Sequence, residues 1–313
     1  MRPHRASFTA RFVAASRGLS PLLPSRLRLV DDPYGAAFAH PALASLVRHA
    51  AGSSGAVRAL AWGPLLPMLP WAVYMQVRTR FFDDAIAAFA RGGGRQLVIL
   101  GAGLDARASR LGESLEGARV FEVDHPATQT YKLAALAAAP SRATYLAWDF
   151  ERDPMTELPA RLAAAGHDPA RPTFTLWEGV TMYLTREALD ATLDAVRAYS
   201  APGSRVAFNY ADRALLERPG AASRAVMRVV RAVGEPFRSG FEPGEVVAWA
   251  ASHGFTVRDD RSFAELARAL LPAPWWRLVR LGRRVATVER SAVGEAHGLS
   301  RDVPVGPLRA ADG

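Results

Sequence analysis

The 313-residue sequence contains no cysteine and only one lysine, Lys132. Without cysteine the chain can form no disulfide, no thiolate metal site and no cysteine nucleophile. These absences suit a reducing compartment, so we expect a cytoplasmic protein. The formal charge of +9 comes from arginines scattered along the chain rather than gathered on one face with aromatic residues. We therefore expect no nucleic-acid partner.

The sequence also lacks a long uninterrupted apolar run. Its most apolar stretch, residues 60–75, is cut by Pro64, Pro67 and Pro70 and is shorter than the ~20 residues that a membrane-spanning helix needs. The arginines and phenylalanines of the first 17 residues resemble an amphipathic targeting segment, but no apolar core of signal-peptide length follows them. We expect no membrane span and no targeting role.

Two kinds of catalytic pattern are missing as well. The seven histidines show no metal-ligand spacing, so we expect no metal site. A G-x-S-x-G motif is absent, which excludes the usual hydrolase nucleophile.

What the sequence does contain is a regular alternation of short apolar runs and helical segments. The predicted strands are residues 96–100, 119–124, 143–146, 173–177 and 204–209, followed by two late strands at 254–257 and 285–288. Repeated strand–helix units predict an α/β fold, a mostly parallel seven-stranded sheet with helices on both faces. We expect the last two strands to form an antiparallel pair that completes the sheet.

The same pattern divides the chain into three parts. Residues 1–91 are predicted to form an N-terminal helical cap, with helices near 43–60 and 71–90. Residues 92–290 are the predicted Rossmann-like core, with an arginine-rich helical lid inserted at about 211–245. Residues 291–313 are predicted to be a flexible tail.

Glycines and acids mark a nucleotide site in this core. Gly101 and Gly103 follow the first predicted strand, where a missing side chain lets a ligand approach the backbone. Glu122 and Asp124 end the second strand about 20 residues later, where an acidic side chain binds the hydroxyls of an adenosine ribose. Together these features predict a nucleoside cofactor.

Asp105 bears on which nucleoside binds. A dinucleotide pyrophosphate at the start of the next helix would be repelled by this carboxylate, whereas a sulfonium compound with an α-amino group would be attracted. Asp105 is also a good helix cap, and capping is compatible with cofactor contact. A nicotinamide-dependent oxidoreductase stays an alternative, because the loose glycine pattern fits it, but the chain has no Tyr-x-x-x-Lys pair. A non-catalytic nucleoside-binding protein is the third reading.

Four motifs in order resemble the leucine carboxyl methyltransferase-like family. They are RTRFFDD at 78–84, QLVILGAGLDAR at 96–107, FEVDHP at 121–126 and WEGVTMYL at 177–184. Ser7-x-Thr9-Ala10, Asp32-Pro33-Tyr34 and Gly234-Glu235-Pro236-Phe237 resemble its bacterial branch. The resemblance implies a class I methyltransferase that uses S-adenosyl-L-methionine.

The resemblance also implies roles for individual residues. Arg78 would pair with the methionine carboxylate of the cofactor, with Arg80 as the alternative. Asp124 would take the ribose hydroxyls, with Glu122 as the alternative, and we expect only one of the two to face the cofactor.

Three further residues complete the predicted site. Asp149 would accept a hydrogen bond from the adenine amine, although a loop aspartate needs no such role. Glu178 would lie beside the methionine moiety and the acceptor pocket. Tyr183 would face the acceptor or pack beneath the lid.

The acceptor is left open by these residues. Methyl transfer requires acceptor oxygen, methyl and sulfur to be held in line and water to be kept out. No obvious general base is present, which favours a carboxylate over a hydroxyl. The family's eukaryotic members methylate a protein carboxylate and its bacterial members include polyketide O-methyltransferases, so we expect O-methylation of a small molecule. Neither the oligomeric state nor a catalytic residue is predicted.

Overall fold

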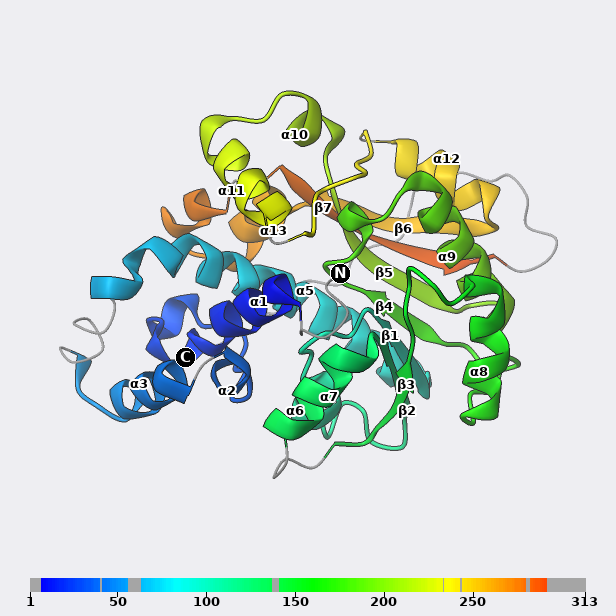
Figure 1. Ribbon diagram of the computed structural model, residues 1–313, viewed down its shortest axis with the longest axis horizontal. Coiled ribbons are helices and arrows are strands. Elements are labelled where there is room, and N and C mark those ends of the chain that lie inside the picture. Colours follow the sequence, from blue (N-terminus) through cyan, green and yellow to red (C-terminus); the bar gives the residue numbers. More distant parts are fainter. Residues whose placement is uncertain are drawn as a thin grey trace.

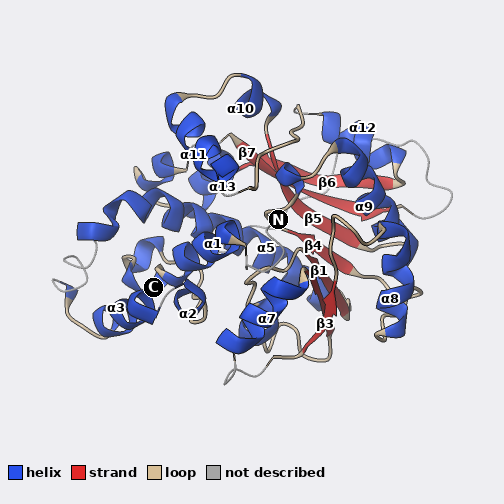
Figure 2. Ribbon diagram, in the orientation of Figure 1, coloured by secondary structure: helices blue, strands red, loops and turns tan. Residues whose placement is uncertain are grey.

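The fold is built around one seven-stranded sheet with the order β3-β2-β1-β4-β5-β7-β6 (Figures 1 and 2). The computed structural model describes residues 7–39, 41–55, 63–136, 141–232, 234–242, 244–279 and 282–291. The strands are β1 (Gln96–Leu100), β2 (Arg119–Asp124), β3 (Ala143–Ala147), β4 (Phe174–Trp177), β5 (Arg205–Ala211), β6 (Phe255–Ser262) and β7 (Arg283–Arg290). The first five run parallel, and β7 pairs antiparallel with both β5 and β6. This is the predicted fold, including the antiparallel pair.

Alternation along the strands produces two apolar faces. In β1, Leu97 and Ile99 face one side of the sheet and Val98 and Leu100 the other, because successive strand residues point in opposite directions. Both faces are buried, so β1 carries five buried residues in a row. A parallel strand covered on both sides shows this continuous apolar pattern, which made it recognisable in the sequence.

Helices cover the two faces. The second face packs against α8 (Leu158–Ala164), α9 (Arg186–Tyr199) and α12 (Glu245–Ser252). The first face packs against α5 (Leu69–Arg91), α6 (Arg107–Arg110) and α13 (Phe263–Leu270). The remaining core helix, α7 (Pro126–Ala135), follows β2.

The N-terminal helices are continuous with the core. They are α1 (Phe8–Gly18), α2 (Gly35–Ala39) and α3 (Pro41–Ala51); α1 lies beside α5, and α2 and α3 pack against α1 (Figure 1). Leu19 and Leu27 belong to the same apolar cluster as Leu97 of β1 and Val285 of β7. The predicted cap therefore shares its hydrophobic core with the sheet, and its boundary near residue 91 coincides with the end of α5.

The predicted lid is helical. It contains α10 (Arg213–Glu217) and α11 (Ala221–Ala232), which lie above the sheet in Figure 1. The sequence pattern did not indicate α1 or α13 as helices. The predicted tail lies outside the described residues except for Ser291. Within the described part of the chain, no helix has both the length and the apolar character to cross a bilayer.

Candidate active site

A cavity of about 990 Å³ lies at the carboxyl edge of the sheet. Its walls are the loops that follow β1, β2, β3 and β4, together with the start of α1, one face of α5 and helix α11. Open α/β sheets bind ligands at this edge. The volume is at the upper end of the ~300–1,000 Å³ range of ligand pockets, which leaves room for a cofactor and a second molecule.

The glycine loop after β1 forms the cavity floor. Gly101 and Gly103 have φ angles of 63° and 52°, in the left-handed region. A Cβ on Gly101 would stand 2.4 Å from Cγ2 of Val180, whereas a Cβ on Gly103 would meet nothing closer than 3.5 Å. Gly101 is therefore required both by its backbone conformation and by the close approach of the loop after β4.

Asp124 ties this loop to the end of β2. Its carboxylate accepts hydrogen bonds from the backbone N–H groups of Gly103 and His125 and lines the cavity. Burial raises the pKa of Asp124 against the effect of these two bonds. A carboxylate has about four acceptor positions, so Asp124 retains capacity for two further donors.

Glu122 occupies a different environment and does not line the cavity. It forms a buried ion pair with Lys132 of α7, and burial raises its pKa to about 7 despite that lysine. Glu122 and Asp124 are two residues apart and so stand on the same face of β2. What separates them is their position along the strand, because only Asp124 reaches the edge. Of the two predicted ribose ligands, the structure thus brings only Asp124 to the site.

Arg78 and Glu178 meet at the cavity wall. Nε of Arg78, on α5, donates to Oε1 of Glu178, directly after β4, at 2.5 Å. Burial opposes the charge on each group, but ion pairing outweighs it. Glu178 raises the pKa of Arg78, and Arg107 together with Arg78 lowers the pKa of Glu178. Both therefore stay charged. Arg80, the predicted alternative to Arg78, pairs with Asp84 on the same helix and lies away from the cavity.

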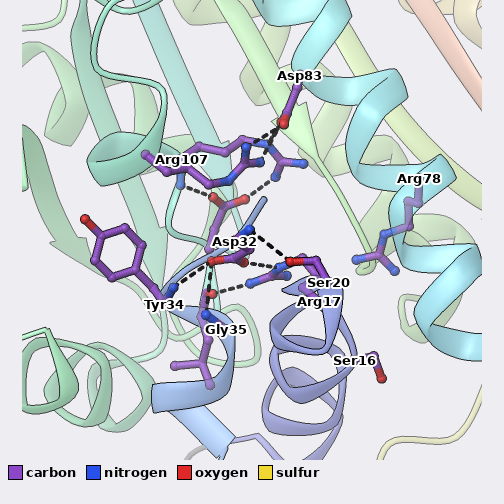
Figure 3. Close-up of polar contacts among 12 residues, drawn as sticks. Ser16, Arg17, Ser20, Asp32, Tyr34, Gly35, Arg78, Asp83 and Arg107 are labelled. Carbon is purple, nitrogen blue, oxygen red and sulfur yellow. Dashed lines mark hydrogen bonds and ion pairs between the residues drawn. The ribbon is translucent and has the colours of Figure 1, made fainter. Parts of the chain in front are cut away.

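Arg107 stands at the centre of this charge cluster. Only 2% exposed, it pairs with Asp105 and donates to Oδ1 of Asp83 at 2.7 Å (Figure 3). Its Nη1 also lies 2.6 Å from Oε2 of Glu178. Burial opposes ionisation of Asp105, but Arg107 holds its pKa well below the usual range. Asp105 also accepts a hydrogen bond from the Arg107 backbone N–H at the start of α6. Asp105 lines the cavity as predicted, with its charge already matched by Arg107.

Arg17 brings α1 against the glycine loop. Its Nε donates to Oδ2 of Asp32 at 2.8 Å, and its Nη2 donates to the backbone oxygen of Leu104 at 2.6 Å (Figure 3). Asp32 in turn accepts from the backbone N–H groups of Tyr34 and Gly35. The Asp32-Pro33-Tyr34 motif thus holds Arg17 of α1 against the glycine loop.

Asp149 and Tyr183 lie in different parts of the cavity. Asp149 follows β3 and has Oδ2 3.7 Å from Nε2 of His125. Tyr183 follows β4 and packs against Phe237 with the ring centroids 5.5 Å apart. Burial raises the pKa of Tyr183, so its phenol is neutral at neutral pH.

Ser7 and Thr9, just before and in the first turn of α1, contact Glu235, and all three residues line the cavity. Ser7 Oγ donates to Oε1 of Glu235 at 2.8 Å, and Thr9 donates to the other carboxylate oxygen. Phe237, two residues after Glu235, lines the cavity. We call the Ser7–Thr9–Glu235 contact the entrance clasp.

Sequence reasoning missed several residues of this site. Arg107 was part of a recognised motif but received no role, and Arg17 was counted only in a targeting-like pattern. Arg283 and Trp71, which also line the cavity, gave no signal at all. Each acquires its role through a partner far away in the sequence, and a single sequence shows no such pairing.

Comparison with known proteins identifies relatives of the chain. The family model described as "Leucine carboxyl methyltransferase" matches residues 10–197. A Mycolicibacterium smegmatis protein is 38% identical over 69% of this chain and 70% of its own length. A Streptomyces avermitilis protein is 35% identical over 68% of this chain and 74% of its own. Both bear the name "Putative S-adenosyl-L-methionine-dependent methyltransferase".

Solved structures agree on the fold. A Streptomyces avermitilis protein described as a duf574 family protein superposes with a TM-score of 0.57 at 19% identity, covering 92% of this chain and 98% of that one. A Thermobifida fusca protein described as a "putative methyltransferase" superposes with a TM-score of 0.51 at 20% identity, covering 88% and 98%. The fold is that of class I methyltransferases.

Proposed function

Because the chain belongs to the leucine carboxyl methyltransferase family, we propose that it transfers a methyl group from S-adenosyl-L-methionine to an oxygen of a small-molecule acceptor. The names of its relatives support the methyl donor. The acceptor oxygen belongs to a carboxylate or a hydroxyl group.

One observation carries this proposal. A single cavity contains the glycine loop and Asp124 together with the Arg78–Glu178 pair, so groups suited to opposite ends of the cofactor line one space. Asp124 has acceptor capacity for the ribose hydroxyls, and the guanidinium of Arg78 suits the methionine carboxylate. Asp149 lines the same cavity and would accept from the adenine amine. At Gly101 the loop is packed so closely on Val180 that a Cβ would stand 2.4 Å from that side chain.

The remaining residues set the electrostatics of the transfer. The bound cofactor supplies an electrophilic methyl group on a positively charged sulfur. Glu178 and Asp105 stay ionised because arginines hold their pKa values low, so negative charge persists on this side of the cavity at neutral pH. Arg78, Arg107 and Arg17 fix the carboxylates and the loop in place, which suits a reaction that depends on positioning.

The raised pKa of Tyr183 favours a methyl acceptor whose reacting group is already ionised. With its pKa raised, the Tyr183 phenol stays protonated and cannot take a proton from the acceptor at neutral pH. A carboxylate acceptor needs no base, whereas a hydroxyl benefits from one. The neutral Tyr183 phenol can instead donate a hydrogen bond to the acceptor.

The test is calorimetric titration of the purified protein with S-adenosyl-L-methionine and, separately, with NADH. Arg78→Gln should weaken binding of the first by about 10- to 150-fold, since hydrogen bonds between charged groups contribute about 1.5–3 kcal/mol. Arg80→Gln, on the same helix but outside the cavity, is the matched control and should change the affinity by less than about 2-fold. Circular dichroism checks that both variants fold.

NADH binding without S-adenosyl-L-methionine binding would overturn the proposal in favour of an oxidoreductase. Equal affinities in wild type and Arg78→Gln would instead remove Arg78 from the binding site. Where binding is confirmed, a screen of carboxylate and phenol acceptors follows.

A further inference from the structure

Arg283 is a cavity residue that the methyl-donor site does not use. It is the first residue of β7 and pairs in register with Ala211, the last residue of β5. Because β7 runs antiparallel to β5, this start of β7 lies at the same sheet edge as the glycine loop. Arg283 lines the cavity together with Trp71, Tyr183 and Phe237.

The guanidinium of Arg283 is surrounded by aromatic rings. Its central carbon lies 5.4 Å from the Trp71 ring, 5.7 Å from the Tyr74 ring and 5.4 Å from the Phe237 ring. Its Nε is buried and has no hydrogen-bond partner among the described residues. No carboxylate of the described chain lies within ion-pair distance of it. The nearby Glu235 is held by Ser7 and Thr9 instead.

This environment differs from that of several other arginines in and around the site. Arg17, Arg78 and Arg107 each contact a carboxylate, and the neighbouring Arg284 donates to Asp260 at 3.0 Å. Aromatic rings attract the charge of a guanidinium but do not accept its N–H groups as a carboxylate does. A buried donor left without an acceptor destabilises the folded protein. Nε of Arg283 is therefore a buried donor that still lacks an acceptor, and an anionic oxygen suits it best.

The position of Arg283 places that anion away from the methyl donor. Trp71, Tyr74 and Arg78 are spaced by three and four residues, so they share one face of α5. With a rise of 1.5 Å per residue, Trp71 lies about 10 Å along the helix from Arg78. Arg78 is assigned to the methionine carboxylate, so an anion held by Arg283 at the Trp71 end is a separate group.

The surroundings of Arg283 describe the rest of the ligand. Val226, Val229 and Val230 of the lid line the cavity, and Val229 is 54% exposed although apolar. Trp71 and Phe237 add aromatic walls. Apolar and aromatic side chains thus line the same cavity as the Arg283 guanidinium.

We propose that Arg283 anchors a carboxylate of the methyl acceptor, separate from the methionine carboxylate that Arg78 binds, and that the acceptor has an aromatic or hydrophobic body. This rests on the proposed methyltransferase function. Arg283 is then a positioning residue that selects acidic acceptors, and the lid valines and aromatic walls hold the body of the molecule.

The test compares two probes of the same shape, 2-naphthoate and 2-naphthamide, by calorimetry on the protein saturated with S-adenosylhomocysteine. Wild type should bind the carboxylate at least about 10-fold more tightly than the amide, as expected for a charge-assisted contact. Arg283→Gln should abolish this preference, and Arg283→Lys should retain part of it. Arg228→Gln removes the same charge from an exposed position on α11 and should leave the preference unchanged.

Affinity for S-adenosyl-L-methionine, measured in parallel, separates the two proposals. Arg283→Gln should keep it within about 2-fold, which also shows that the variant folds. Equal binding of the two probes to wild type, no binding of 2-naphthoate, or a preference that survives in Arg283→Gln would overturn the role of Arg283 while leaving the methyltransferase proposal intact. A wild-type protein that does not bind S-adenosyl-L-methionine would overturn the proposed function itself.

Discussion

At the scale of single residues, the site depends on the close approach of backbone at Gly101 and on a buried cluster of paired charges. Four arginines, Arg17, Arg78, Arg107 and Arg110, are interleaved with four carboxylates, Asp32, Asp83, Asp105 and Glu178. Buried charges are tolerated when each has a partner, and removing one partner is strongly destabilising. The cavity wall is consequently fixed before any ligand binds.

Gly101→Ala should destabilise the protein by about 2–5 kcal/mol, because a left-handed conformation and a clash with Val180 act together. Gly103→Ala, which meets only ordinary contacts, should cost about 1–2 kcal/mol. Urea denaturation measures both values.

The double variant Gly101→Ala/Val180→Ala separates the two causes. If the clash contributes, removing the Val180 methyl groups should restore part of the stability lost in Gly101→Ala. A double variant no more stable than Gly101→Ala alone would show that the backbone conformation accounts for the whole loss.

The residue scale is also where sequence reasoning was weakest. Gly101, Asp124, Arg78 and Glu178 were recognised because each belongs to a local motif at the end of a strand or on a predicted helix. The partner of Asp105 could not be foreseen, since whether its carboxylate faces Arg107 or the cofactor depends on side-chain packing. Arg283 became visible only when β7 was paired with β5.

At the scale of elements, prediction succeeded because the periodicities are strong. β1 and β2 were predicted with the bounds that the structure has, since parallel strands buried on both faces are short runs of mostly apolar residues. By contrast α1 is rich in alanine and arginine, and its burial depends on contacts with α2 and α5. A pattern confined to one segment cannot show such contacts.

The entrance clasp connects two elements, and its loss should loosen the first turn of α1. Glu235→Gln removes the charge that Ser7 and Thr9 bind, so we expect faster hydrogen exchange of the backbone amides at the start of α1. Hydrogen-exchange mass spectrometry measures this.

Glu217→Gln, an exposed position on α10, is the control and should exchange like wild type. Unchanged protection of α1 in Glu235→Gln would show that the clasp does not hold the segment. In that case the contacts of Arg17 suffice.

At the scale of the whole molecule, stability should depend on pH through His167. This residue is 4% exposed, has Nε2 2.9 Å from Oγ1 of Thr173 and packs edge-on against Phe121 and Tyr199. Burial lowers its pKa to about 4 from an ordinary 6.5. Below pH 6.5 the unfolded chain binds a proton that the folded protein refuses, so stability is full above pH 6.5 and falls as the pH drops towards 4.

The loss attributable to His167 should reach about 3 kcal/mol across that interval. Urea denaturation at pH 7.5 and pH 4.5 gives the free energy of unfolding of wild type and of His167→Gln. The stability lost between the two pH values should be larger in wild type, and the difference between the two losses is the contribution of His167. The exposed His49→Gln is the control. Equal pH dependence of wild type and His167→Gln would contradict the assignment.

The buried pairing of Lys132 with Glu122 has a practical consequence for the intact protein. Lys132 is the one lysine of the chain and is 1% exposed. Reagents that acylate primary amines can reach its Nζ only when α7 separates from β2. The rate at which this single side chain is labelled therefore reports opening of the fold, without any engineered probe, and a bound ligand that stabilises the closed molecule would slow it.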